Sequence, residues 1–302
     1  VIACDMHPGY ASTRWAERQG QPVIRIQHHG AHASALAGEH PDVQKWLVFT
    51  WDGVGYGEDG TLWGGEALTG SPGSWQRAAS FRPFKLVGGD RAGREPWRSA
   101  AALLWAVEHE SGRHRHPGQG AFLNGFVEER ERQVAHQAWQ GGVNTFETSA
   151  AGRLFDAAAA LVLGRGVSSF EGQGPMELEH AAAAGTDAIA MPLRADATGI
   201  LRSDWSPLLP VLTDTGLSQG ERSGLFHESM AQALVDQALA LRESVPFEAV
   251  GLSGGVFQNR FLTERVAAKL AGVGVDVRLH REVPANDGGL CFGQIIETLA
   301  RQ

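Results

Sequence analysis

The sequence of 302 residues is 43% hydrophobic and 20% charged, with a formal net charge of −8. This composition is typical of a soluble globular protein, and the length allows one large domain or two lobes around a cleft. The acidic balance argues against general binding to nucleic-acid phosphates, and no apolar run approaches the ~18 residues of a membrane span. The two cysteines, Cys4 and Cys291, imply no disulfide framework and fit a reducing, cytoplasmic compartment.

The first part of the chain predicts alternating strands and helices. The expected elements are a strand at 1–5, a helix at 12–19, a strand at 23–27, a helix at 28–40 and a buried strand at 46–51. A hairpin is expected after the last strand, where Glu-Asp-Gly separates two apolar segments. Because a domain rarely begins inside a core strand, the opening VIACD predicts that further residues precede it in the native protein.

The remainder of the chain continues the alternation. Helices are expected at 96–108, 149–163, 176–184, 224–244 and 260–270, strands at 249–252 and 275–279, and a last helix after 286–289. Residues 110–125 predict a loop rich in Gly, His and Pro, and 186–210 predict short strands and turns. Strands that alternate with helices indicate a mixed α/β architecture.

The stretch QHHGAHA contains candidate metal ligands. On a helix, His28 and His32 lie four residues apart and project from one face, the spacing by which one helix supplies two imidazole ligands. His29 points elsewhere, so a carboxylate from another segment is needed, and Asp287 of NDGG is a candidate unless it only caps the final helix. The alternative is a solvated or capping histidine cluster, which is also our interpretation of the H-x-H at 114–116.

Two glycine-rich segments are candidate phosphate or nucleotide loops. In TWDGVGYGEDG, backbone N–H groups can surround a phosphate and Asp52 can lie near a metal. In GLSGGVFQN, Gly254 and Gly255 allow a nucleotide to approach a helix start, and Asn259 can bind a base or ribose. The alternatives are a glycine-rich β-turn and a tight strand–helix turn, respectively.

Eight motifs occur along the chain in one characteristic order: CDMHPGYASTRWA, QHHGAH, WDGVGYGEDGTLWGGE, GGDRAGREPWR, GRLFDAAAALVLG, FEGQ, LSGGVFQN and VPANDGG. Together they resemble the C-terminal domain of the HypF family, the carbamoyltransferases of nickel–iron hydrogenase maturation. The resemblance spans residues 1 to about 298. That domain is similar to the tRNA threonylcarbamoyl transferase TsaD and to antibiotic O-carbamoyltransferases.

The resemblance implies the two-lobed α/β fold of actin, sugar kinases and heat-shock ATPases, in which ATP binds between the lobes. Residues 1–44 with 285–302 would form an incomplete first lobe that carries the metal site. Residues 45–284 would form the second lobe, with the phosphate and adenosine loops. The first-lobe phosphate hairpin and the acylphosphatase-like, zinc-finger-like and YrdC-like domains of the family would lie upstream of Val1.

The family's functional positions map onto this sequence. The resemblance implies His28, His32 and Asp287 as ligands of iron or zinc. It implies nucleotide contacts at Asp52, Gly53, Gly55, Gly57, Gly152, Asp156, Gly172, Gly254, Gly255 and Asn259. Asp5 and His7 are candidate contacts to the acceptor or the carbamoyl group, with a structural strand-end turn as the alternative. Gly30 and the sequence EGQGP depart from the family pattern.

The implied activity is ATP-dependent carbamoyl transfer. A carbamoyl group from carbamoyl phosphate would pass through carbamoyl-adenylate, with release of AMP, to the C-terminal cysteine of a HypE-like acceptor protein. Mg²⁺ could accompany the nucleotide, and no nucleic-acid or membrane partner is expected. One alternative is an O-carbamoyltransferase acting on a small molecule. Another is a nucleotide-binding module that is inactive without upstream domains.

Overall fold

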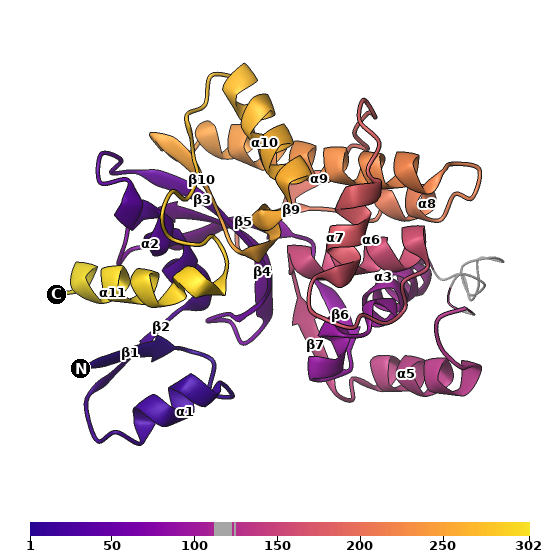
Figure 1. Cartoon of the computed structure of the whole chain (residues 1–302), viewed down its shortest axis with the longest axis horizontal. Coiled ribbons are helices and arrows are strands. Elements are labelled where there is room, and N and C mark those ends of the chain that lie inside the picture. Colours follow the sequence, from indigo (N-terminus) through magenta and orange to yellow (C-terminus); the bar gives the residue numbers. More distant parts are fainter. Residues whose placement is uncertain (112–122, 124) are drawn as a thin grey trace.

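The structure, a computed structural model, describes residues 1–111, 123 and 125–302, so the H-x-H at 114–116 lies outside the described residues. Its smaller sheet has two parallel strands, β1 (Ile2–Asp5) and β2 (Val23–Ile26), which are joined through helix α1 (Ala11–Glu17). These elements lie at the N-terminal corner of the molecule in Figure 1. The strand predicted at 1–5 is confirmed.

The larger sheet has nine strands among the described residues, and β3 lies in its interior, next to the central strand β4. β3 pairs in parallel with β10 and antiparallel with β4. The sheet order is β11-β10-β3-β4-β5-β9-β8, and β7 pairs with both β4 and β6. The strands are β3 (Trp46–Tyr56), β4 (Leu62–Gly70), β5 (Gln76–Phe81), β6 (Phe84–Val87), β7 (Thr145–Thr148), β8 (Leu193–Ala195), β9 (Leu201–Ser203), β10 (Ala249–Ser253) and β11 (Val277–Arg278).

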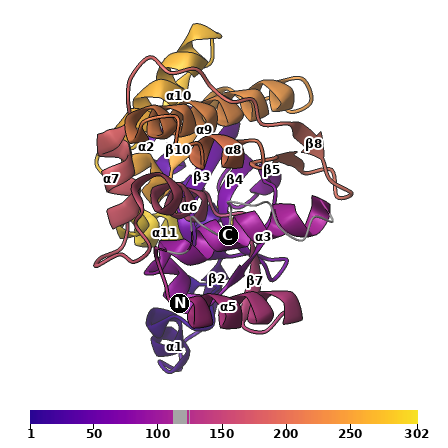
Figure 2. The ribbon, with the colours of Figure 1, turned by 90° about the vertical axis from the view of Figure 1, so that its right-hand side faces the viewer.

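Helices cover both faces of this sheet (Figures 1 and 2). Successive β3 side chains point to opposite faces: Val48 packs with the helix α2, whereas Leu47 and Phe49 belong to the larger core under α3, α6 and α9. The helices are α2 (His28–Glu39), α3 (Pro96–Ser111), α5 (Glu129–Gly141), α6 (Ala151–Leu163), α7 (Gln173–Ala181), α8 (Leu208–Leu212), α9 (Gln219–Arg242), α10 (Arg260–Gly272) and α11 (Leu290–Ala300). The predicted mixed α/β architecture is therefore confirmed. None of the described helices is long and apolar enough to cross a membrane.

The predicted end of the third strand at residue 51 is wrong. β3 continues to Tyr56, and its pairing register with β4 shifts between Trp51 and Gly55. This bulge accommodates the glycines that suggested a loop. The turn of the hairpin comes later, where the Gly57 N–H donates to Thr61 O over 2.9 Å.

The helix α2 packs closely against the last helix, α11. At Gly293 of α11, a Cβ atom would lie 1.8 Å from the carbonyl oxygen of Ala31, so only glycine allows this approach. At the other end of the contact, a Cβ on Gly38 would lie 2.8 Å from the ring of Phe292. The close packing brings the turn before α11 (Asp287–Gly289) beside the first turns of α2.

Candidate metal and nucleotide site

Four side chains from three separate segments converge beside the start of α2. His28 and His32 come from α2, Asp52 from β3, and Asp287 from the turn before α11. One potential ligand atom of each lies within 4.8 Å of all the others. The structure thus brings together the three predicted metal ligands and adds Asp52, which we had expected near a metal but as a nucleotide contact.

His28 is oriented from behind by Asp5. Its Nδ1 lies 2.7 Å from Asp5 Oδ2, and both side chains are buried. The other Asp5 oxygen accepts the His7 N–H over 2.7 Å, while the His7 ring stacks on Tyr10 with centroids 4.4 Å apart. This arrangement fixes the tautomer of His28 and turns its Nε2 toward Asp52, 3.2 Å away. Asp5 therefore faces His28, and neither Asp5 nor His7 lines the cleft described below.

The donor set and its spacing fit a divalent metal ion. Nε2 of His32 is buried and has no hydrogen-bond partner among the described residues. It lies 3.3 Å from Asp287 Oδ1 and 3.6 Å from Asp52 Oδ2. Two imidazoles and two carboxylates suit zinc or iron, and a cation between them would give the His32 nitrogen a partner.

The charges around the cluster favour a cation at its centre. Burial lowers the pKa of His28 and of His32, but the neighbouring carboxylates of Asp287 and Asp52 outweigh it, and both pKa values end above the ordinary range. Burial acts against ionised Asp287, yet the two histidines lower its pKa to about 2. His29 differs: burial lowers its pKa well below the usual value, and it is not part of the group of four.

A cleft of about 830 Å³ opens next to this cluster. Asp52 and Asp287 belong both to the metal group and to the wall of the cleft. Seven of the ten predicted nucleotide positions line it: Asp52, Gly53, Gly152, Asp156, Gly172, Gly255 and Asn259. A Cβ on Gly152 would lie 2.8 Å from the Gly53 Cα, so α6 begins in direct contact with the β3 bulge.

The other three predicted positions, Gly55, Gly57 and Gly254, do not line the cleft. A side chain at Gly55 would collide with the rings of His29 and His28, and one at Gly57 with the indole of Trp63. Gly254 has φ +101°, and a Cβ there would lie 2.2 Å from the Trp51 carbonyl oxygen. The structure gives these glycines a packing role.

Asn259 lines the cleft, but its amide is already engaged. Its Oδ1 accepts the Leu262 N–H over 2.8 Å as the N-cap of α10, and its Nδ2 lies 2.9 Å from His227 Nε2. Because His227 Nδ1 lies 2.8 Å from Ser223 O, the tautomer with hydrogen on Nδ1 leaves Nε2 free to accept from Asn259.

Sequence reasoning missed the cation in the cleft. Arg153 lies between Gly152 and Asp156 in GRLFD, and a Cβ on Gly53 would lie 3.3 Å from its Nη2. Its Nη1 is 3.0 Å from Asp156 Oδ2. Burial raises the pKa of Asp156 to about 6. The sequence did offer a signal for this role. Arg153 directly follows Gly152, a predicted nucleotide contact that lies against Gly53 of the glycine-rich segment.

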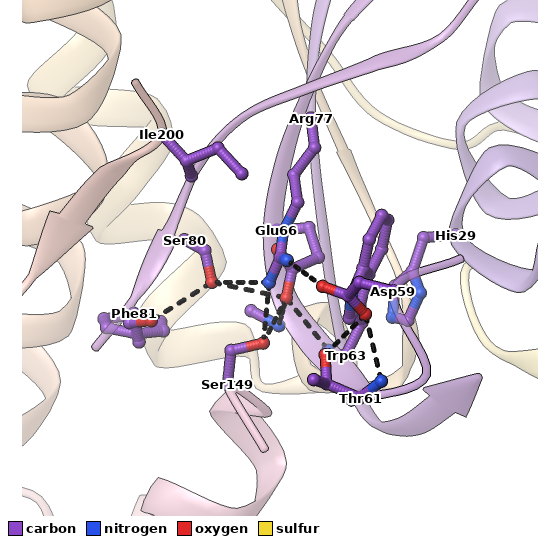
Figure 3. A network of polar contacts seen from close by, with 12 residues as sticks. His29, Asp59, Thr61, Trp63, Glu66, Arg77, Ser80, Phe81, Ser149 and Ile200 are labelled. Carbon is purple, nitrogen blue, oxygen red and sulfur yellow. Dashed lines mark hydrogen bonds and ion pairs between the residues drawn. The ribbon is translucent and has the colours of Figure 1, made fainter. Parts of the chain in front are cut away.

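A second buried polar network supports the β3–β4 hairpin (Figure 3). Glu66 of β4, fully buried, accepts hydrogen bonds from Arg77 over 2.5 Å and from Ser149, which precedes α6. Arg77 also binds Asp59 over 2.9 Å and stacks on the Trp63 ring at 4.2 Å. The network therefore connects the hairpin with the start of α6. These are the two segments that contact each other at Gly53 and Gly152.

Two family descriptions match the sequence. "Carbamoyltransferase, Kae1-like Domain, second subdomain" matches residues 48–294, and "HypF Kae1-like domain" matches residues 1–39. Carbamoyltransferase HypF of Synechocystis is 35% identical over the whole chain, which covers 40% of that relative. A "Carbamoyltransferase HypF homolog" of Cupriavidus necator is 37% identical, with 97% of this chain and 76% of that relative covered.

Solved structures agree with the sequence comparisons. A crystal structure of full-length HypF in the phosphate- and nucleotide-bound form matches with a TM-score of 0.88 and 32% identity, over 98% of this chain and 38% of that one. HypF of T. kodakarensis matches with a TM-score of 0.82 and 27% identity. The chain thus spans about two fifths of the length of most of these relatives.

Proposed function

The chain belongs to the HypF family of carbamoyltransferases, and we propose that it is the part of such an enzyme that transfers a carbamoyl group from carbamoyl-adenylate to an acceptor. One observation carries the proposal: Asp52 and Asp287 are shared by the metal group and the wall of a cleft large enough for a nucleotide. The relatives' names and the nucleotide-bound HypF structure support it. Because the chain spans about two fifths of these relatives, the activity of the whole protein remains our proposal.

We assign the two ends of the cleft to two parts of the chain. Residues 1–44 with 285–302 contribute His28, His32 and Asp287, and residues 45–284 contribute the nucleotide walls. Asp52 belongs to the second part and reaches the metal group across the boundary. This division supports a metal at the junction, where a nucleotide phosphate from one part can meet it.

The chemistry starts when water hydrolyses carbamoyl phosphate to carbamate and inorganic phosphate. A carbamate oxygen bonds to the α-phosphorus of ATP, and pyrophosphate leaves. An acceptor thiolate then bonds to the carbonyl carbon, and the bond from that carbon to the phosphate oxygen breaks. AMP leaves with the electron pair. The acceptor we propose is the C-terminal cysteine of a HypE-like protein in the cytoplasm.

The residues of the cleft have distinct tasks in this scheme. A zinc or iron ion held by His28, His32, Asp52 and Asp287 would supply Lewis-acid neutralisation of the charge on the phosphate. Arg153 lies beside Gly53, where it can bind a phosphate oxygen. Asp5 keeps Nε2 of His28 directed at the metal position, and Mg²⁺ can accompany the ATP phosphates before adenylation.

The proposal is tested by measuring binding and transfer on the same preparations. Isothermal titration with ATP and AMP reports on the cleft, and transfer from ¹⁴C-labelled carbamoyl phosphate to a peptide ending in cysteine reports on the chemistry. Both assays use the chain and the longest natural form of the protein, with Asp287→Asn as the control. We expect both forms to bind the nucleotides. We also expect carbamoyl transfer to the peptide, which Asp287→Asn should abolish. Binding without transfer by either form would instead support a nucleotide-binding module.

A further inference from the structure

Glu39, the last residue of α2, forms hydrogen bonds with the backbone of the segment that leads to Asp287. Glu39 accepts three consecutive backbone N–H groups, from Arg281 over 3.2 Å, Glu282 over 2.6 Å and Val283 over 3.1 Å. Its side chain is only 8% exposed. Three amides that converge on one carboxylate hold the backbone of this loop against the end of the helix. The loop runs from β11 to α11 beside α2 (Figure 1).

A second set of contacts extends these interactions to the metal helix. His280 Nδ1 lies 2.9 Å from Glu39 Oε2, and His280 Nε2 lies 2.9 Å from Ser253 Oγ at the end of β10. Ser253 Oγ in turn donates to the His32 carbonyl oxygen over 3.0 Å. Glu39, His280 and Ser253, which we call the clamp, thus connect the last residue of α2 and the carbonyl group of His32 with the loop.

The loop needs such support because of the residue that it carries. Asp287 is the exposed member of the metal group, with 64% of its side chain accessible, whereas His28 and His32 are buried. It lies on a three-residue 3₁₀ turn, without strand or helix pairing on its N-terminal side. Upstream of it, the clamp holds 281–283, and the Ala285 carbonyl accepts the Gly254 N–H over 2.8 Å.

We propose that Glu39 and His280 are positioning residues that fix Asp287 relative to His28 and His32 and so preassemble the metal site. This inference rests on the metal site of the proposed function and adds residues that do not touch the metal or the substrate. Glu39 stays ionised at neutral pH. Burial raises its pKa, but the three backbone N–H groups and His280 more than reverse this.

The proposal predicts that Glu39 acts on metal binding through Asp287. Titration with Co²⁺, followed by its visible absorption, reports both affinity and ligand geometry. We expect Glu39→Gln to weaken Co²⁺ binding by about tenfold, as loss of a residue supporting a ligand does, and to change the absorption spectrum. In an Asp287→Asn background, Glu39→Gln should not lower the Co²⁺ affinity any further. Glu248→Gln is the matched control, because Glu248 also accepts a backbone N–H, from Gln44 over 2.9 Å, away from the site.

An equal loss of affinity in the Asp287→Asn background would overturn the proposal, because Glu39 would then act on the fold in general. His280→Asn is the second variant, in case Glu39→Gln folds poorly. It can still donate to Glu39 but loses the link to Ser253, and a severalfold weaker Co²⁺ affinity is expected. Unchanged affinity in the folded variants would also count against the clamp.

Hydrogen exchange of the metal-free protein separates the clamp from the proposed function. Glu39→Gln should speed amide exchange at residues 281–283 at least tenfold and leave α9 unchanged. Uniform acceleration, or no change, would contradict the clamp. A wild-type chain that bound no Co²⁺ would refute the metal site, and the exchange result would still decide whether Glu39 holds this loop.

Discussion

Two buried polar clusters include residues of the β3–β4 hairpin, Asp52 in one and Glu66 in the other, and they differ in how completely they are paired. In the Glu66 cluster, Oε1 accepts from Ser80 and Ser149 and Oε2 accepts from Arg77. In the metal group, Nε2 of His32 has no hydrogen-bond partner among the described residues and its nearest carboxylate oxygen is 3.3 Å away. The first cluster is closed by its own residues, and the second has a place for an ion.

This difference in pairing indicates that the Glu66 cluster supports the fold, whereas the metal group binds a ligand. A buried ion pair with all its partners in place adds little net stability, but removing one partner leaves a charge without compensation, at a cost of about 3–5 kcal/mol. Two carboxylates and two imidazoles that meet without full pairing gain most from an added cation. We therefore expect mutations in the closed cluster to lower stability and mutations in the open cluster to remove ligand binding.

The largest expected effect is the loss of metal binding when one ligand of the metal group is removed. His32→Ala removes one of its two imidazoles and should abolish bound metal and carbamoyl transfer, with an affinity loss beyond the ~10–100-fold caused by losing a supporting residue. Metal content after dialysis and the transfer assay measure this. His29→Ala is the control, since His29 is equally buried on the same helix but outside the group. Retained metal with full transfer in His32→Ala would refute the site.

The second prediction concerns the closed cluster. Glu66→Gln leaves the Arg77 guanidinium, whose side chain is 9% exposed, without its buried carboxylate. We expect the free energy of unfolding to fall by about 3–5 kcal/mol, while metal stoichiometry at 10 °C stays at the wild-type value. Urea unfolding measures the first quantity.

Asp59→Asn provides the matched control for Glu66. Asp59 binds the same arginine, but its side chain is 43% exposed, so its loss should cost about 1 kcal/mol or less. Equal destabilisation by the two substitutions would show that burial does not distinguish them. Loss of metal from Glu66→Gln while the protein remains folded would show that the two clusters are not separate in function.

The sequence predicted the parts of this comparison that depend on local spacing. Helical periodicity placed His28 and His32 on one face, and the ordered motifs identified the family and its mixed α/β fold, both confirmed by the HypF matches. The division into two lobes stays a prediction. The roles of the individual site residues stay predictions. The glycines at 53 and 55 suggested a loop because glycine disfavours strands, whereas pairing with β4 continues the strand through a bulge.

Long-range contacts could not be derived in this way. His280 and Glu39 are 241 residues apart, and no periodicity connects them. Glu66 was visible only as the last letter of a motif, because its partners lie on β5 and before α6. The helix α5 and the strands β6 and β7 were not predicted either, since their short or polar segments carry little pattern of their own.

The last prediction concerns Asp156, a buried carboxylate that is intermediate between the two clusters because it forms an ion pair with Arg153 but also lies near the like charge of Glu171. Burial raises its pKa from 3.8 to about 6. Between these values the folded protein holds a proton that the unfolded chain has released, so the contribution of Asp156 to stability falls as pH rises. Asp156→Asn removes this pH dependence. Between pH 4 and pH 7, the free energy of unfolding of the variant should therefore rise relative to that of the wild type by up to about 3 kcal/mol, at 1.36 kcal/mol per pKa unit.

Urea unfolding of both proteins at four pH values between 4 and 7 measures the difference. A difference that stays constant across this range would mean that Arg153 compensates the charge fully and that Asp156 belongs with the closed cluster. A difference that grows with pH would instead identify Asp156 as a carboxylate that the fold leaves partly uncompensated at the cleft. In that case AMP binding to the variant reports whether the charge is needed there, because freeing Arg153 from its partner should strengthen its contact with a phosphate.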